Sequence, residues 1–189
     1  AFFAGFLPTP ARPGRHPRPF ALRFEGSETI DERTLVLDGA SIPEGLLQAA
    51  ELMVSCLESE GVERIFAIPG EETLEIVEAL RQSPIEIVIV RHEQGAAFMA
   101  DVHGRLTGRA GVCLGTLGPG ATNLITGIAD AFLDYAPMVA ITGQVRLDLV
   151  HKESHQYVDV VDMLRPVTKW NSRIERTEKM GAVSNGMLC

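Results

Sequence analysis

The side chain with the clearest potential for acid–base chemistry in this sequence is the carboxylate of Glu93. It follows a run of branched apolar residues, IEIVIV at 85–90, and lies within Arg91-His92-Glu93-Gln94 at the expected start of a helix. Burying a charge at the end of a core strand costs several kcal/mol unless a partner binds it. A carboxylate in a dry crevice gains affinity for a proton, which suits proton exchange with a bound ligand. Its alternative roles are a favourable charge at a helix N-terminus or an ion pair with Arg91 or Arg105.

A second candidate is the glycine-rich segment Gly118-Pro119-Gly120 within GTLGPGATN, which ends an apolar run and precedes a helical pattern. Backbone N–H groups at such a helix N-terminus attract anions. The segment lacks the Gly-Lys-Ser/Thr of a phosphate-binding P-loop, and it departs from G-x-G-x-x-G at the last glycine, where Asn123 stands. A tight turn between a strand and a helix is therefore the alternative interpretation.

The histidines and cysteines do not form a metal-site pattern. His92, His103 and His151 lack metal-ligand spacing on a shared helix face, so we expect structural or surface roles for them. The three cysteines are odd in number and show no C-x-x-C spacing, which favours neither a disulfide framework nor a zinc site. We therefore expect no metal ligand in this sequence, and a reducing compartment such as the cytoplasm.

Four short apolar runs alternate with helical patterns along the middle of the sequence. The runs lie at 64–68, 85–90, 111–117 and 138–143, and the helical patterns cover about 72–82, 93–107 and 121–134. Such alternation predicts a doubly wound α/β fold, with a parallel sheet that carries helices on both faces. The carboxyl ends of parallel strands meet at one edge, where open α/β sheets bind their ligands. We therefore expect the segments after the four runs to converge on one site.

The sequence divides into three parts by composition. Residues 1–24 contain four arginines, five prolines and no acidic residue, and we expect residues 1–40 to be a disordered or non-native leader. Residues 41–174 form the expected domain, which opens with an amphipathic helix over 41–60. Residues 175–189 show no clear period, and we expect a tail or a truncated linker to a further domain.

The charge balance disfavours several classes of function. The 189 residues carry a formal net charge of −8 and form no sustained basic stripe, so a nucleic-acid surface is not expected. No apolar run reaches the roughly 18–20 residues that cross a bilayer, so we expect no membrane partner. A transit peptide at 1–24 is the weaker alternative to a cytoplasmic location, because such peptides are rich in serine and the first serine is Ser27.

Five ordered motifs resemble the pyrimidine-binding domain of thiamine-diphosphate enzymes. They are RIFAIPGEE, IVRHEQGAAFMADVHGRLTG, GVCLGTLGPGATNLITGIADA, PMVAITGQ and HKESHQYVDVVDMLRPVTKW, and the resemblance covers roughly residues 45–174. Within that superfamily they are most similar to the large, catalytic subunit of acetolactate synthase. The resemblance implies the same doubly wound fold and an enzyme that condenses two pyruvates to acetolactate with loss of CO₂, in branched-chain amino-acid or acetoin metabolism.

The resemblance also implies roles for individual residues. Glu93 would bind the N1′ nitrogen of the cofactor's aminopyrimidine and so promote loss of the C2 proton of the thiazolium. Gln156, which follows His155, would reach toward the substrate and the thiazolium as the second catalytic residue. Besides Glu93, the cofactor-binding residues implied by the resemblance are Pro69, Gly70, Glu71, Gly118, Pro119, Gly120 and Asn123.

The expected cofactor is thiamine diphosphate with Mg²⁺. No Gly-Asp-Gly occurs in the sequence, so the magnesium ligands are expected on a separate diphosphate-binding domain, and this chain would supply only the pyrimidine-binding half of the site. The resemblance leaves FAD binding open. Expected partners are pyruvate or a related 2-keto acid, a second copy in a homodimer or homotetramer, and a regulatory small subunit.

Two alternatives to a synthase stay open, and the short length favours the first of them. One is the pyrimidine-binding subunit of a split α-keto-acid decarboxylase of the sulfopyruvate or phosphonopyruvate type. The other is an inactive interaction module that keeps only the association surface. The HKESHQYVDVVDMLRPVTKW segment favours the synthase over the split enzyme, and the presence of Glu93 argues against an inactive module. As part of a synthase, this chain is a fragment that we expect to be inactive by itself.

Overall fold

The computed structural model describes residues 2–6, 36–37, 40–41 and 49–175. Four strands of its main sheet are parallel and lie in the order β5-β4-β6-β7. Their bounds are β4 (Arg64–Ala67), β5 (Glu86–Ile89), β6 (Gly111–Gly115) and β7 (Met138–Thr142). Each of the four apolar runs in the sequence therefore forms a strand, as predicted.

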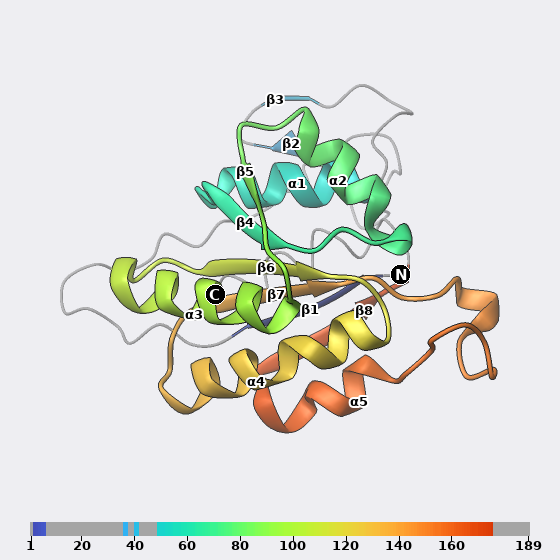
Figure 1. The fold of residues 1–189 in the computed structure, drawn as a ribbon. Helices are drawn as coiled ribbons and strands as arrows, with labels where there is room; N and C mark the ends of the chain where they lie inside the picture. The colour runs from blue at the N-terminus through green and yellow to red at the C-terminus, as the bar shows by residue number, and fades with distance from the viewer. Residues whose placement is uncertain (1, 7–35, 38–39, 42–48, 176–189) are drawn as a thin grey trace, which may run out of the picture.

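Helices cover both faces of this sheet, as Figure 1 shows. One face carries α1 (Ala49–Ser59) and α2 (Leu74–Arg81), and the other carries α3 (Glu93–Thr107), α4 (Pro119–Leu133) and α5 (Val160–Leu164). Successive side chains of a strand point to opposite faces. Along β7, Val139 and Ile141 accordingly join the apolar layer of α1 and α2, whereas Met138 and Ala140 join that of α3 and α4. The predicted doubly wound α/β fold is confirmed.

Two further strands extend the sheet beyond β7, and the first of them runs antiparallel to these four. β1 (Phe2–Phe6) lies between β7 and β8 (Trp170–Ile174) and pairs antiparallel with both. Because β8 is antiparallel to β1, it runs in the same direction as β7, and the complete order is β5-β4-β6-β7-β1-β8. The predicted parallel sheet is confirmed for the four strands above, and β1 is an antiparallel addition to it. β8 escaped the sequence analysis because its residues, WNSRI, are mostly polar and half-buried, which removes the apolar contrast of a core strand.

The structure describes short strands within the predicted leader at 1–40. These are β1 and a separate pair formed by β2 (Val36–Leu37) and β3 (Ala40–Ser41). The remaining residues of 1–40, most of the predicted tail at 175–189, and 42–48 of the predicted first helix lie outside the described residues. The limits of the leader, the domain at 41–174 and the tail stay predictions.

The helices that position the candidate site begin close to their predicted first residues. α3 spans 93–107 as predicted, and the side chain of its N-cap, His92, accepts a hydrogen bond from the Gln94 N–H. α4 begins at Pro119, two residues earlier than predicted, because proline suits the first position of a helix. The predicted helix at 72–82 is divided into a 3-10 turn, η1 (Glu71–Thr73), and α2.

Arg105 joins α3 to α4 through three carboxylates. Its guanidinium binds Asp101 on α3 at 2.8 Å, Asp130 on α4 at 2.9 Å, and Asp134 directly after α4. The hydrogen bonds to Asp101 and then to Asp134 raise the pKa of Arg105 above its ordinary value. Asp101 is 1% exposed, so the positive charge of Arg105 offsets part of the free-energy cost of burying the Asp101 carboxylate.

No helix within the described ranges combines the length and the hydrophobicity that crossing a bilayer requires.

Candidate functional site

The candidate site lies where the order of the parallel strands reverses. The chain runs from β4 outward to β5 and then returns to β6 on the other side of β4. Ligand crevices of open α/β sheets lie at the carboxyl ends of the strands at such a switch point. Glu72 follows β4, Glu93 follows β5 and Thr116 follows β6, so three elements bring polar side chains to this edge.

The Glu93 carboxylate is buried and held by a neutral partner. Glu93 is the first residue of α3 and is 9% exposed. Its Oε2 accepts a hydrogen bond from Nδ2 of Asn123 on α4 at 2.9 Å. Arg105, considered above as an ion-pair partner, binds other carboxylates instead. The structure therefore brings the predicted residues Glu93 and Asn123 together, and it leaves lone pairs of the carboxylate available to a ligand that donates a hydrogen bond.

Thr116 lies at the centre of the turns around Glu93, and the sequence analysis missed it. A Cβ added to Gly70 would lie 2.4 Å from Thr116 Cβ, and one added to Gly120 would lie 2.8 Å from Thr116 Cγ2. Thr116 Oγ1 also donates a hydrogen bond to Oε2 of Glu72 at 2.8 Å. Both predicted glycines are thus needed for close packing of the loops after β4 and β6. The only signal for Thr116 in the sequence is its place between an apolar run and Gly118-Pro119-Gly120.

Gln156 is brought to the turn that precedes α4. A Cβ on Gly118 would lie 2.3 Å from the carbonyl oxygen of Gln156, so the main chains of the two residues are in contact. Both residues have a φ of 52°, which Gly118 adopts readily. For a residue such as Gln156 this conformation costs about 1–3 kcal/mol and persists only where the surroundings impose it. The structure thus joins Gly118 and Gln156, which are 38 positions apart, whereas their roles in cofactor and substrate binding stay predictions.

Other residues singled out in the sequence analysis are exposed to solvent around the site. Pro69, Glu71, Pro119 and His155 are exposed. In the η1 turn, it is Glu72 that reaches Thr116, whereas Glu71 has no side-chain hydrogen bond or ion pair to any described residue. A role for Glu71 in cofactor binding therefore stays a prediction, and Glu72 is the acidic residue of this turn that the geometry favours.

Two carboxylates in the site accept hydrogen bonds from uncharged side chains. Glu93 accepts a hydrogen bond from an amide, and Glu72 accepts one from a hydroxyl. No ion pair involving either side chain occurs among the described residues. A buried carboxylate without a cation is best completed by a ligand that presents an N–H group or a protonatable ring nitrogen. The aminopyrimidine of thiamine diphosphate has this chemistry, so the residues present fit that cofactor.

The described residues show no candidate metal centre, since no group of three or more His, Cys, Asp or Glu side chains among them could hold an ion. The absence of magnesium ligands from the chain as a whole stays a prediction.

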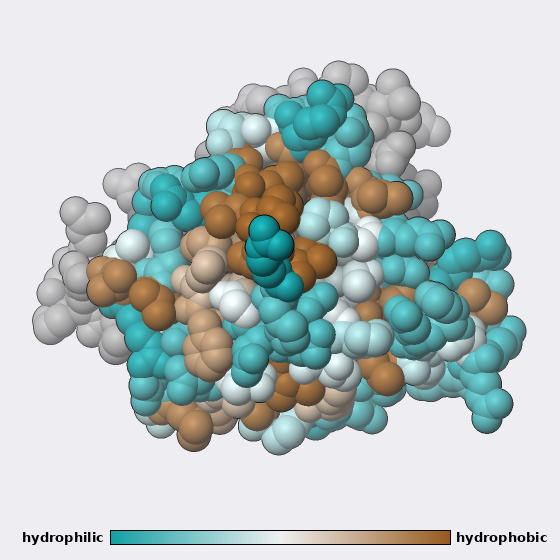
Figure 2. All heavy atoms as spheres, in the orientation of Figure 1, coloured by the Kyte–Doolittle hydropathy of each residue, from teal (hydrophilic) through white to brown (hydrophobic). Residues whose placement is uncertain are grey.

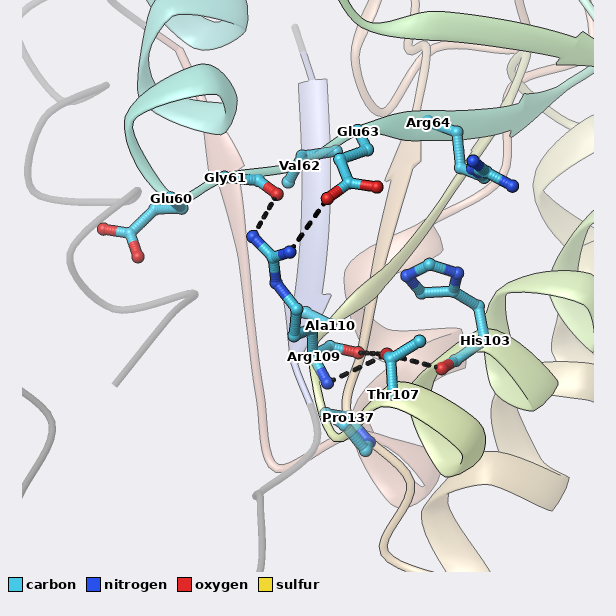
Figure 3. A pocket seen from close by; sticks show the side chains of 10 residues that line it. All are labelled: Glu60, Gly61, Val62, Glu63, Arg64, His103, Thr107, Arg109, Ala110 and Pro137. Atoms are coloured by element: carbon cyan, nitrogen blue, oxygen red, sulfur yellow. Dashed lines mark hydrogen bonds and ion pairs between the residues drawn. The ribbon is translucent and has the colours of Figure 1, made fainter. Parts of the chain in front are cut away.

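A pocket of about 290 Å³ lies away from this site, at the amino ends of β4 and β6 (Figure 3). The Arg109 guanidinium donates a hydrogen bond to the Gly61 carbonyl at 2.6 Å and pairs with Glu63 at 3.0 Å. Arg109 therefore satisfies main-chain and acidic groups just after α1. No residue predicted for catalysis or cofactor binding lines this pocket, and its interactions are those of a structural junction.

His103 on α3 faces this pocket (Figure 3), and we expect its protonation to make the stability of the protein depend on pH. The pKa of His103 is lowered mainly by burial and, to a smaller extent, by the positive charges of Arg64 and Arg109. The negative charge of Glu63 acts in the opposite direction. Because its pKa is lowered on folding, the stability contributed by neutral His103 is complete above the unfolded value of about 6.5 and is lost as pH falls through the lowered folded pKa. We expect the free energy of unfolding to fall less below pH 6.5 in His103→Gln than in the parent. Urea denaturation at several pH values tests this, and parallel curves for the two proteins would contradict it.

Known proteins resemble the part of the chain that builds the site. Residues 47–163 match the family described as thiamine pyrophosphate enzyme, N-terminal TPP binding domain. The chain is 43% identical over 134 residues to a probable acetolactate synthase large subunit of Methanocaldococcus jannaschii. It is 45% identical over 130 residues to a chloroplastic acetolactate synthase of Arabidopsis thaliana, and 44% identical over 134 residues to an acetolactate synthase large subunit of Buchnera aphidicola.

These similarities cover most of this chain and a small part of each relative. They include 71%, 68% and 70% of this chain, and 23%, 19% and 24% of the relatives in the same order. The chain therefore spans about a quarter or less of the length of these curated relatives.

Proposed function

This chain belongs to the thiamine pyrophosphate enzymes through its match to their N-terminal TPP binding domain, and from that premise we propose that it supplies the pyrimidine-binding half of a thiamine-diphosphate site. The observation that carries this proposal is the position of Glu93, which is buried at the carboxyl edge of the sheet and, among the residues that the structure describes, is bound by the Asn123 amide alone. A carboxylate held in this way can share a proton with the N1′ nitrogen of a bound aminopyrimidine.

Each group in this half-site has a separate task. Thiamine diphosphate supplies the carbanion chemistry when it is bound. Glu93 would hold the proton at N1′, and Asn123 would restrain the carboxylate through its hydrogen bond to Oε2. The Gly70 and Gly120 turns pack their main chains closely against the Thr116 side chain and so would hold the loops after β4 and β6 together. Gln156 offers a neutral amide that can bind a carboxylate or carbonyl oxygen of the substrate.

The reaction that we propose is the condensation of two pyruvates to acetolactate with release of one CO₂. This choice rests on the identities of 43–45% to proteins named acetolactate synthase. In the balanced reaction, one pyruvate loses its carboxylate as CO₂, and its remaining two-carbon unit forms a carbon–carbon bond to the keto carbon of the second. The oxygen of that keto group takes up one proton to become the hydroxyl of acetolactate. Protein groups other than the described residues would hold Mg²⁺ and the diphosphate.

A second copy of the chain is the partner that we propose for the outer face of α3. Phe98, Met99, Val102 and Leu106 recur at helical spacing and are exposed, Leu106 to 81%. Figure 2 shows further hydrophobic residues gathered over the edge strand β5, where Ile89 is exposed. Exposed apolar surface of this kind marks an association surface, and association also provides a route to the other half of the site.

The proposed reaction can be tested with a chimera in which this chain replaces the matching segment of the Methanocaldococcus jannaschii relative. We expect the chimera to convert ¹³C-labelled pyruvate to acetolactate with thiamine diphosphate and Mg²⁺, and the chain alone to form none. Cofactor binding, followed by circular dichroism, is the control for correct assembly. A chimera that binds the cofactor but releases only acetaldehyde would contradict the synthase and favour a decarboxylase.

A further inference from the structure

Residues 146–156, here called the arm, extend from the sheet close to the candidate site. The arm leaves the carboxyl end of β7, contains a short 3-10 turn, η2 (Leu147–Leu149), and returns toward α5 (Figure 1). Most of its residues are exposed, and it forms no strand pairing. Its internal hydrogen bonds are short-range, such as that from the Lys152 N–H to the Leu149 carbonyl. The position of the arm must therefore be set at its two ends.

Gln144 connects both ends of the arm. It lies just after β7 and is 6% exposed. Its Oε1 accepts a hydrogen bond from the Val145 N–H at 3.0 Å, and its Nε2 donates one to the Val158 carbonyl at 2.9 Å. A single buried amide thus links the residue at which the chain leaves the sheet to the residue at which it returns, 14 positions later.

The returning end carries Gln156, which is two residues before Val158. Its left-handed backbone needs support from its surroundings, and the contact with Gly118 provides this support on one side. The Gln144 bond to Val158 provides it on the other side. Without that bond, the exposed arm gains conformational freedom at its return, and the entropy regained would favour separation of Gln156 from Gly118.

We propose that Gln144 is a positioning residue that acts through Gln156, by fastening the return of the arm to the end of β7. The catalytic value of this position rests on the function proposed above for Gln156. Gln144 itself does not reach the reacting atoms in this proposal. Its task is to hold the main chain at 156–158, which fixes the position of the Gln156 Cα beside the turn before α4.

The test uses NMR on the complete 189-residue chain. The Cβ of Gln156 lies 2.9 Å from the position of a Cβ on Gly118, so the parent should show a nuclear Overhauser effect between Gly118 Hα and Gln156 Hβ.

Gln144→Glu keeps the acceptor for the Val145 N–H, but its ionised carboxylate cannot donate to the Val158 carbonyl. We expect this variant to lose the Gly118–Gln156 signal and to retain the signals between β6 and β7. Gln144→Met, which keeps the length without a charge, should give the same loss and covers the case in which the glutamate variant does not fold.

Asn171→Asp is the matched control, because Asn171 also donates partly buried amide hydrogen bonds outside the arm, to Thr168 Oγ1 at 2.9 Å and to the Val161 carbonyl at 3.3 Å. This variant should keep the Gly118–Gln156 signal. The proposal is overturned if the signal is absent from the parent, or if it persists in a folded Gln144 variant. Loss of the signal without any effect of Gln156→Ala on pyruvate turnover in the chimera would instead refute the function of Gln156 and leave the positioning intact.

Discussion

Glu93→Gln is expected to slow acetolactate formation by an assembled enzyme containing this domain by roughly 10²–10⁴-fold, the usual loss when a positioned acid–base group is removed. Glutamine keeps the shape of the side chain, and its oxygen can still accept the hydrogen bond from Asn123. It cannot hold a proton at N1′ as a carboxylate does. The substitution therefore separates proton transfer from packing at the start of α3.

Steady-state turnover of pyruvate measures this effect, with cofactor saturation confirmed for each variant. Glu75→Gln is the matched control, because Glu75 is exposed on α2 and lacks the hydrogen bond from Asn123 that Glu93 accepts. We expect the control to retain the parental rate. A turnover of Glu93→Gln equal to that of Glu75→Gln would show that the buried carboxylate has no part in the reaction.

Arg105→Met is expected to lower the free energy of unfolding by about 2–4 kcal/mol, because it leaves the buried Asp101 without its cation. The cost stays below that of a fully buried pair, because the Arg105 side chain is 34% exposed and water screens part of the charge. Asp130 and Asp134 lose the same partner, so the connection between α3 and α4 is weakened as well.

Urea denaturation of the parent and the variant gives this difference directly. Arg81→Met is the control, since Arg81 pairs with Glu78 on the exposed face of α2. Exposed ion pairs contribute little, so the control should leave stability nearly unchanged. If the two arginine variants have the same stability, the Arg105 cluster does not hold the helix pair together.

The parts of the fold that the sequence predicts well are those with strong apolar contrast. β6 and β7 are buried along their whole length, and their near-continuous apolar runs indicate parallel strands covered on both faces. α3 shows its boundaries through the His92 cap and through Gly108, which ends it in a left-handed conformation. β8 lacks such contrast, and its partner β1 lies more than 160 positions earlier, so neither could be placed from local pattern.

The prediction of the candidate site depended more on the resemblance to a known family than on the spacing of residues in the sequence. Glu93 stands out in the sequence because a charge follows a core strand, but its partner Asn123 is 30 positions away. The hydrogen bond from Thr116 to Glu72 spans 44 positions, and that from Gln144 to Val158 spans 14. Such contacts are set by the packing of loops at one edge of the sheet, and no local period in the sequence reports them.

Hydrogen–deuterium exchange at C2 of the bound cofactor, measured without pyruvate, tests most directly whether Glu93 acts on N1′. Acid quenching followed by proton NMR gives the exchange rate before any carbon–carbon bond forms. We predict rapid exchange in the parent and in Glu75→Gln, and exchange slower by roughly 10²–10⁴-fold in Glu93→Gln. Exchange in Glu93→Gln within a few-fold of the parent would contradict the role of Glu93, even if turnover were reduced.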